Sequence, residues 1–170
     1  KKNTFVSRAA VGCVTTAIFL LLCIIKGIYP FGIATLDTVD FQSQWIPAYY
    51  HVWDVLHGDG SAFFDWRVGG GNNFAGVSAQ FSLFSPFNLF FLFVKRSWIE
   101  KSMIVFIIIK LLAMGYGMRW FLKEQILKEE RYGIYILAGS VGYAVNGYTL
   151  LYYGMGWLDV AAILPLLCYF

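Results

Sequence analysis

Long apolar runs, rather than alternating apolar and polar positions, dominate the hydrophobic pattern of this chain. Stretches with few or no charged residues cover residues 9–31, 102–121, 132–153 and 159–170. A helix needs ~20 mostly apolar residues to cross the ~30 Å hydrocarbon core of a bilayer, and the first three runs reach that length. The pattern therefore predicts membrane-spanning helices over these three ranges and the beginning of another at residue 159.

The first apolar run has an alternative interpretation as a secretory signal peptide. It exceeds the ~7–15 apolar residues of such a segment, and no small-residue cleavage site follows it. Basic residues near the ends of spans tend to stay in the cytoplasm, and Lys1, Lys2 and Arg8 precede this run. We therefore predict a cytoplasmic N-terminus, an external loop over residues 35–101 and a cytoplasmic loop over residues 122–131.

The segment 81–94, FSLFSPFNLFFLFV, could itself cross the membrane and reverse everything after it. Length argues against a crossing, because fourteen residues at ~1.5 Å rise reach only ~21 Å of the ~30 Å core. Pro86 further interrupts a helix. We expect this segment to lie in the outer membrane interface.

Composition supports a membrane protein. Hydrophobic residues make up 59% of the chain and charged residues only 14%, against ~25% charged in soluble domains. With 13 basic and 10 acidic residues and no long block of one sign, nucleic acid is not an expected partner. Cys13, Cys23 and Cys168 lie in apolar runs, so no disulfide is expected. Since Lys1 is not an initiator methionine and the last run continues to the end, we expect residues 1–170 to be the N-terminal fragment of one transmembrane domain.

The predicted external loop holds five of the six aspartates in the chain, and loops of this length are usually functional. Solubility alone explains Asp54, Asp59 and Asp65. It explains Asp37 and Asp40 less well, because these two carboxylates lie three residues apart just beyond the first span. Either could instead be a helix N-cap, a position that favours aspartate.

A helix is predicted over residues 41–56, with Pro47 near a first turn and Gly58 as a stop signal. Its apolar positions recur at spacings of three and four, which places them on one face: Phe41, Trp45, Tyr49, Val52 and Leu56. Packing or contact with the membrane surface explains this face without a ligand. His51, Asp54 and His57 follow on the same helix, but His57 points away from the other two and no fourth ligand is evident, so we predict no metal site there.

A glycine-rich stretch, FFDWRVGGGNNFAG, follows this helix. Its glycines allow close approach to a ligand, and exposed backbone N–H groups could hold a phosphate; a flexible turn is the favoured alternative. Asn72 is a candidate for substrate binding here. Arg67 is the only lysine or arginine between Lys26 and Lys95, which makes it a candidate partner for an anion, or for Asp65 or another carboxylate nearby.

Several short motifs occur in a fixed order from Asp37 to the end of the chain. They are D-x-x-x-Q-W-x-P from Asp40, W-x-x-G-x-G from Trp66, S-P-F-N-L from Ser85, G-Y-A-x-x-G-Y from Gly142 and W-L-D-x-x-x-x-L-P-L from Trp157, with Lys110 in the apolar helix between the third and fourth. This order resembles the N-terminal portion of the bacterial YfhO membrane-protein family, which is similar to the GT-C superfamily of polytopic glycosyltransferases.

The resemblance implies an all-α bundle of transmembrane helices with a long first external loop that contains interfacial helices. It implies a glycosyltransferase of the bacterial plasma membrane that moves a sugar from a polyprenyl-phosphate carrier to a cell-surface polymer such as teichoic acid. An acidic residue near the start of the first external loop serves catalysis in GT-C enzymes; Asp40 holds that place here, with Asp37 as the second candidate. Further candidate substrate-binding residues on the matched motifs are Gln44, Trp45, Trp157 and Asp159.

The proposed chemistry needs a base for the acceptor hydroxyl and a cation for the leaving lipid phosphate. Arg67, Lys26 and Lys110 are candidates for the cation, and Lys110 stands out because a charge near mid-span costs ~2.5–3.5 kcal/mol on insertion scales. No cofactor is firmly indicated, although two carboxylates would allow a divalent cation. A transporter or flippase of lipid-linked substrate and a non-catalytic assembly protein are the competing functions.

Overall fold

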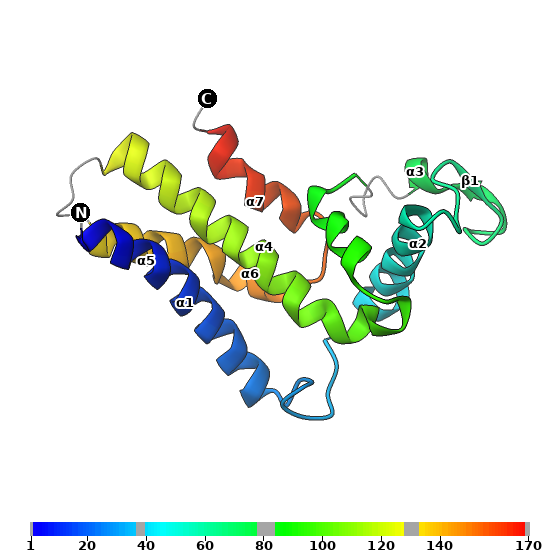
Figure 1. Cartoon of the computed structure of the whole chain (residues 1–170), viewed down its shortest axis with the longest axis horizontal. Helices are drawn as coiled ribbons and strands as arrows, with labels where there is room; N and C mark the ends of the chain where they lie inside the picture. Colours follow the sequence, from blue (N-terminus) through cyan, green and yellow to red (C-terminus); the bar gives the residue numbers. More distant parts are fainter. Residues whose placement is uncertain (1, 37–39, 78–83, 128–132, 169–170) are drawn as a thin grey trace. The chain divides into compact units, whose positions relative to one another are not determined.

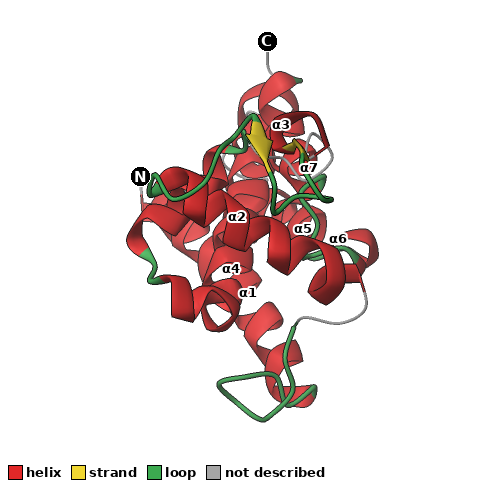
Figure 2. Cartoon of the chain, turned by 90° about the vertical axis from the view of Figure 1, so that its right-hand side faces the viewer, coloured by secondary structure: helices red, strands yellow, loops and turns green. Residues whose placement is uncertain are grey.

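The computed structural model describes residues 2–36, 40–77, 84–127 and 133–168. Helices make up most of these residues, and the only strands among them form one small hairpin (Figure 2). The chain divides into two compact units. Unit 1 comprises residues 1–34, 107–153 and 160–170, and unit 2 comprises residues 35–106 and 154–159. Unit 2 therefore contains the whole of the loop that the sequence predicts to be external, residues 35–101.

Unit 1 contains most of the apolar helical segments. They are α1 (Lys2–Ile25), most of α4 (Ile99–Phe121), α5 (Gly133–Ala144), α6 (Gly147–Leu151) and nearly all of α7 (Leu158–Leu167), with a π-helical turn at Leu122–Ile126 (Figure 1). Helix α1 packs against α5. Helix α4 approaches both closely at Gly115, where an added Cβ would lie 3.2 Å from Val11 and 3.6 Å from Ala144. A small residue allows this approach of helix backbones.

Within the described residues, two helical segments are long and apolar enough to cross a membrane, namely Arg96–Ile126 and Gly133–Leu151. They contain the predicted spans 102–121 and most of 132–153. The second is interrupted after Ala144, and the side chain of Asn146 caps the next helix by accepting a hydrogen bond from the Thr149 N–H at 2.9 Å. The apolar helices Ala9–Ile25 and Leu158–Leu167 are shorter.

Helix α1 ends at Ile25, whereas the sequence predicts an apolar span to residue 31. The chain turns at Gly27, which has a φ of +62°. The Gly27 N–H donates to the Ile24 carbonyl and the Ile28 N–H donates to the Cys23 carbonyl. These two bonds form a Schellman motif, which satisfies the last carbonyls and ends the helix.

Unit 2 is built around the helix predicted over residues 41–56, and that prediction is confirmed. The segment begins as a π-helical turn at Phe41–Trp45 and continues as α2 (Ile46–Leu56), with Pro47 in the first turn of α2. Its predicted apolar face is the packing face: Phe41, Trp45, Tyr49 and Val52 are all buried. Gly58 follows the helix end with a φ of +83°, a conformation that glycine adopts at little cost.

The remaining elements of unit 2 are short. Strands β1 (Phe64–Asp65) and β2 (Asn72–Asn73) pair antiparallel, and α3 (Phe74–Val77) follows them. Two 3-10 helices, Pro86–Phe93 and Arg96–Trp98, lead into α4. The first lies in the segment expected in the membrane interface, of which residues 81–83 are outside the described ranges. At ~2.0 Å rise per residue its eight residues extend about 16 Å, too short for a crossing.

Aromatic side chains form the core of unit 2. The Tyr49 ring lies 5.2 Å from that of Phe91 and 5.3 Å from that of Phe106, measured between ring centroids, and the Phe91 and Phe106 rings are 5.0 Å apart. These spacings are in the range of favourable aromatic pairs. The cluster therefore fixes α2 against the 3-10 helix Pro86–Phe93 and the first turns of α4, and α2 and the start of α4 carry residues of the candidate site.

Candidate functional site

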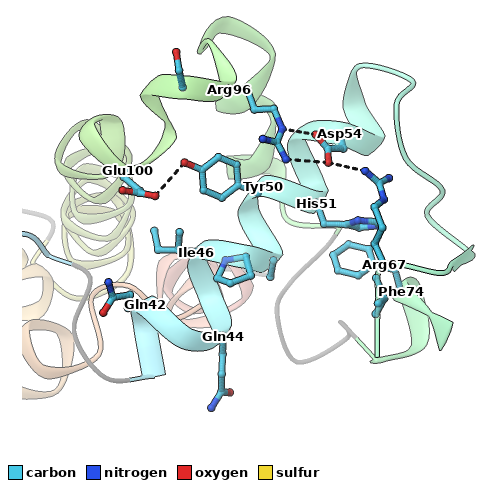
Figure 3. Close-up of a pocket in the computed structure, with 14 residues that line it drawn as sticks. Gln42, Gln44, Ile46, Tyr50, His51, Asp54, Arg67, Phe74, Arg96 and Glu100 are labelled. Carbon is cyan, nitrogen blue, oxygen red and sulfur yellow. Dashed lines mark hydrogen bonds and ion pairs between the residues drawn. The ribbon is translucent and has the colours of Figure 1, made fainter. Parts of the chain in front are cut away.

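One open pocket of about 960 Å³ lies in unit 2, beside α2 (Figure 3). Helix α2, the glycine-rich loop, the 3-10 helix Arg96–Trp98 and the start of α4 all contribute to its lining. The apolar lining residues are Ile46, Pro47, Ala48, Val68 and Phe74; the polar ones are Gln42, Gln44, Tyr50, His51, Asp54, Arg67, Arg96, Ser97 and Glu100. A pocket of this size with a few polar groups on an apolar lining is suited to a small ligand or to part of a larger one.

Asp54 is the centre of the charged part of this pocket. Its side chain is only 8% exposed, and its carboxylate accepts hydrogen bonds from two arginines. Nη1 of Arg67 lies 3.1 Å from Oδ2, and Nε of Arg96 lies 2.8 Å from Oδ1. The interpretation of Asp54 as an acid present for solubility is therefore wrong, because a buried carboxylate needs paired donors.

Arg67 connects the glycine-rich loop to α2. Besides its bond to Asp54, its Nε donates to Oδ1 of Asp65 at 3.0 Å, and its Nη2 donates to Oδ2 of Asp65 at 2.7 Å and to the Asp59 carbonyl at 2.9 Å. The alternative that Arg67 pairs with Asp65 or a neighbouring carboxylate is confirmed. These hydrogen bonds hold the pKa of Asp65 well below its usual range. The Asp65 side chain is only 10% exposed and is paired with Arg67, so solubility does not explain Asp65 either.

Arg96 reaches Asp54 from the opposite end of the carboxylate, and its guanidinium lies over the Tyr50 ring at 4.9 Å from the centroid. The Tyr50 hydroxyl donates to Oε1 of Glu100 at 3.0 Å, so the ring lies between Glu100 and Arg96 (Figure 3). No local sequence signal indicates this pairing, because Arg96 and Asp54 are 42 residues apart.

Asp40 is exposed and occupies the N-cap position of the segment Phe41–Trp45, but its side chain makes no capping hydrogen bond. Its Oδ1 instead accepts a hydrogen bond from Nε2 of Gln44 at 3.3 Å. Gln44 lines the pocket, so Asp40 lies one hydrogen bond from the lining. Asp37, the second candidate base, lies outside the described residues.

Trp45, Trp157 and Asp159 belong to the same unit but do not line the pocket. The Trp45 and Trp157 rings lie 6.0 Å apart, edge to face. Asp159 is only 5% exposed. The Tyr49 hydroxyl donates to the Gly154 carbonyl at 3.2 Å, and burial, together with the nearby charge of Asp159, raises the pKa of Tyr49. The structure thus places Trp45 and Trp157 together in the packing of unit 2.

Two further candidate binding residues are not among the residues that line the pocket. Asn72 is exposed in β2, and its side-chain oxygen accepts a hydrogen bond from the Asn73 N–H at 2.8 Å. Lys110 belongs to unit 1, where it is only 2% exposed within α4. A charged residue buried in a candidate membrane span has a functional or pairing role by default.

The His51, Asp54 and His57 side chains take part in separate interactions. Nε2 of His51 lies 3.1 Å from the Ser61 carbonyl, whereas Nδ1 of His57 lies 2.9 Å from the Trp53 carbonyl and its ring stacks on Trp53. Across residues 2–36, 40–77, 84–127 and 133–168, no three histidine, cysteine, aspartate or glutamate side chains converge in a way that could hold a metal ion.

A sequence model of one protein family, described as bacterial membrane protein YfhO, matches residues 12–169. This range covers almost the whole chain, including both units and every residue of the pocket. No curated protein and no solved structure matches the chain.

Proposed function

Because the chain belongs to the YfhO family of bacterial membrane proteins, we propose that it is a multi-pass glycosyltransferase of the plasma membrane. In this proposal it moves a sugar from a polyprenyl-phosphate carrier to a cell-surface polymer such as teichoic acid. The observation that carries it is the pocket of unit 2. The exposed carboxylate of Asp40 is hydrogen-bonded to Gln44, which lines this pocket. The lining also contains Arg67, Arg96 and several neutral hydrogen-bonding groups.

The transfer step assigns roles to these groups. An acceptor hydroxyl oxygen attacks the anomeric carbon of the sugar, and the bond from that carbon to the phosphate oxygen breaks. The phosphate leaves with the bonding electron pair, and the hydroxyl proton passes to Asp40, with Asp37 as the other candidate base. A carboxylate within hydrogen-bond reach of the hydroxyl suits this role, and the charge that develops on the phosphate needs positively charged donors.

The experiment that tests this function uses membranes that contain the full-length protein, a panel of radiolabelled polyprenyl-phosphate hexoses and isolated cell-wall polymer. We expect label to appear on the polymer only when both the protein and the polymer are present. Absence of transfer with every donor of the panel, from protein present at a normal membrane level, would contradict the proposal.

Lys110 favours a second candidate function, transport of a lipid-linked substrate, because a buried charge in a candidate span suits a translocation pathway. The two functions differ when no acceptor is present. A transporter moves labelled lipid-linked sugar across sealed vesicles that lack the polymer, whereas the enzyme leaves its distribution unchanged.

The orientation is part of the proposal and has its own test. With the N-terminus in the cytoplasm, a cysteine at Asp59, which is exposed in unit 2, should react with an impermeant maleimide in intact cells. A cysteine at Glu129, in the predicted cytoplasmic loop, should react only after the cells are opened. Both variants are built in a background in which Cys13, Cys23 and Cys168 are replaced by alanine. The reverse labelling pattern would place unit 2 in the cytoplasm, away from the cell-surface acceptor.

A further inference from the structure

We propose that Arg96, rather than Arg67, binds the phosphate of a ligand in the pocket of unit 2. This inference rests on the proposed function, because it assigns the group that would hold the phosphate of the lipid carrier. The two arginines look alike at first. Both line the pocket, both donate to Asp54, and the side chain of each is 52% exposed.

The hydrogen bonds of Arg67 leave it little capacity for a ligand. A guanidinium has five N–H groups, and those of Arg67 donate through Nε to Asp65, through Nη1 to Asp54, and through Nη2 to both Asp65 and the Asp59 carbonyl. Four of the five are therefore engaged. Binding a phosphate in the two-pronged manner typical of arginine would break contacts that hold the glycine-rich loop to α2.

Arg96 has more N–H groups available for a ligand than Arg67 has. Among the described residues, its hydrogen bonds run from Nε to Oδ1 of Asp54 at 2.8 Å and from Nη2 to Oδ2 at 3.4 Å. Both N–H groups of Nη1 and one of Nη2 therefore remain, and they suit a phosphate with two oxygens facing the guanidinium. Asp54 and the Tyr50 ring fix the guanidinium plane (Figure 3), which lowers the entropy lost when a ligand binds.

The charges around the pocket limit the expected strength of binding. Two guanidiniums and two carboxylates, Asp54 and Glu100, line it, so the lining has no large excess of positive charge. Asp54 already accepts from both arginines and Glu100 accepts from Tyr50. Affinity for the phosphate should therefore come from the directed hydrogen bonds of Arg96. The apolar side chains of Ile46, Val68 and Phe74 also line the pocket and can contact the rest of the ligand.

The test compares the binding of three probes to the purified full-length protein in detergent: farnesyl phosphate, farnesol and inorganic phosphate. The unaltered protein should prefer farnesyl phosphate to farnesol. Arg96→Gln should reduce that preference about tenfold, equivalent to ~1.4 kcal/mol, and Arg96→Lys should restore part of it. Lys95→Gln is the matched control, because Lys95 is exposed next to Arg96 but does not line the pocket.

Each outcome has a defined meaning. Inorganic phosphate that competes with farnesyl phosphate identifies a site for the phosphate alone, whereas binding of farnesyl phosphate without such competition identifies the lipid phosphate as the ligand. An Arg96→Gln variant with the unaltered preference, or no preference in the unaltered protein, overturns the assignment. Thermal unfolding shows whether the variants are folded, and Arg96→Lys keeps the test valid if Arg96→Gln is not. Sugar transfer is measured separately, so failure of this assignment is distinct from failure of the proposed function.

Discussion

Replacing Asp40 by asparagine is expected to lower the rate of sugar transfer by at least about 100-fold while the amount of protein in the membrane stays the same. General base catalysis typically contributes ~10²–10⁴-fold to a rate, and an amide cannot accept the hydroxyl proton. The fold should tolerate the change, because Asp40 is exposed, does not cap its helix, and is hydrogen-bonded to Gln44 at a long 3.3 Å. The measurement is the initial rate of label transfer per amount of membrane protein.

Asp59→Asn is the matched control for this prediction. Asp59 is an exposed aspartate of the same unit, and only its backbone carbonyl takes part in the Arg67 network, so the variant should transfer sugar at the unaltered rate. Asp37→Asn tests the second candidate base. Full activity of Asp40→Asn together with loss of activity in Asp37→Asn would assign the base to Asp37. Full activity in both variants would remove the carboxylate mechanism altogether.

The helix over residues 41–56 was predictable because everything that defines it is local. Its apolar face recurs at helical spacing, Pro47 fits a first turn, and Gly58 supplies the positive φ that follows the end. The end of α1 was predictable in principle by the same kind of signal. Gly27 directly follows the last apolar turn and adopts the left-handed conformation of a Schellman motif, but the apolar residues beyond it favoured a longer span.

The charged part of the pocket could not be predicted in the same way. Asp54 is separated by 13 residues from Arg67 and by 42 from Arg96, so no spacing along one helix or strand brings these groups together. Their contact depends on how the glycine-rich loop and the start of α4 pack beside α2. An aspartate near a polar loop has the same local sequence signal whether it is solvated or buried, so the sequence alone does not distinguish Asp54 and Asp65 from aspartates present for solubility.

Asp40 and Gln44 represent an intermediate case. They lie four residues apart, which places them on the same side of a helical segment, and their hydrogen bond is local. The resemblance to the YfhO family predicts both residues as candidates for the site. Their position beside the pocket follows only from tertiary packing, because the opposite part of the lining, which includes Arg67, Phe74 and Arg96, is distant from them in sequence.

Phe91→Ala is expected to destabilise unit 2 by about 3–5 kcal/mol, the usual cost of removing a buried phenylalanine ring. The Phe91 side chain is fully buried, and its ring lies 5.2 Å from that of Tyr49 and 5.0 Å from that of Phe106. Its loss leaves a cavity among the three elements that support the pocket. Denaturant titration of the purified protein in detergent, followed by tryptophan fluorescence, measures the change, since Trp45 is buried in this unit.

Phe93→Ala provides the matched control, since Phe93 belongs to the same 3-10 helix but is 88% exposed. Its removal should change the free energy of unfolding by less than about 0.5 kcal/mol in detergent. The segment contains several phenylalanines, so the comparison shows whether the loss of stability depends on the burial of the ring that is removed. Equal losses in the two variants would mean that Phe93 packs as tightly as Phe91, and the aromatic cluster would then not be what holds α2 beside the start of α4. A large loss for Phe91→Ala alone would show that the aromatic cluster stabilises α2 and the start of α4, and both of these elements contribute residues to the pocket lining.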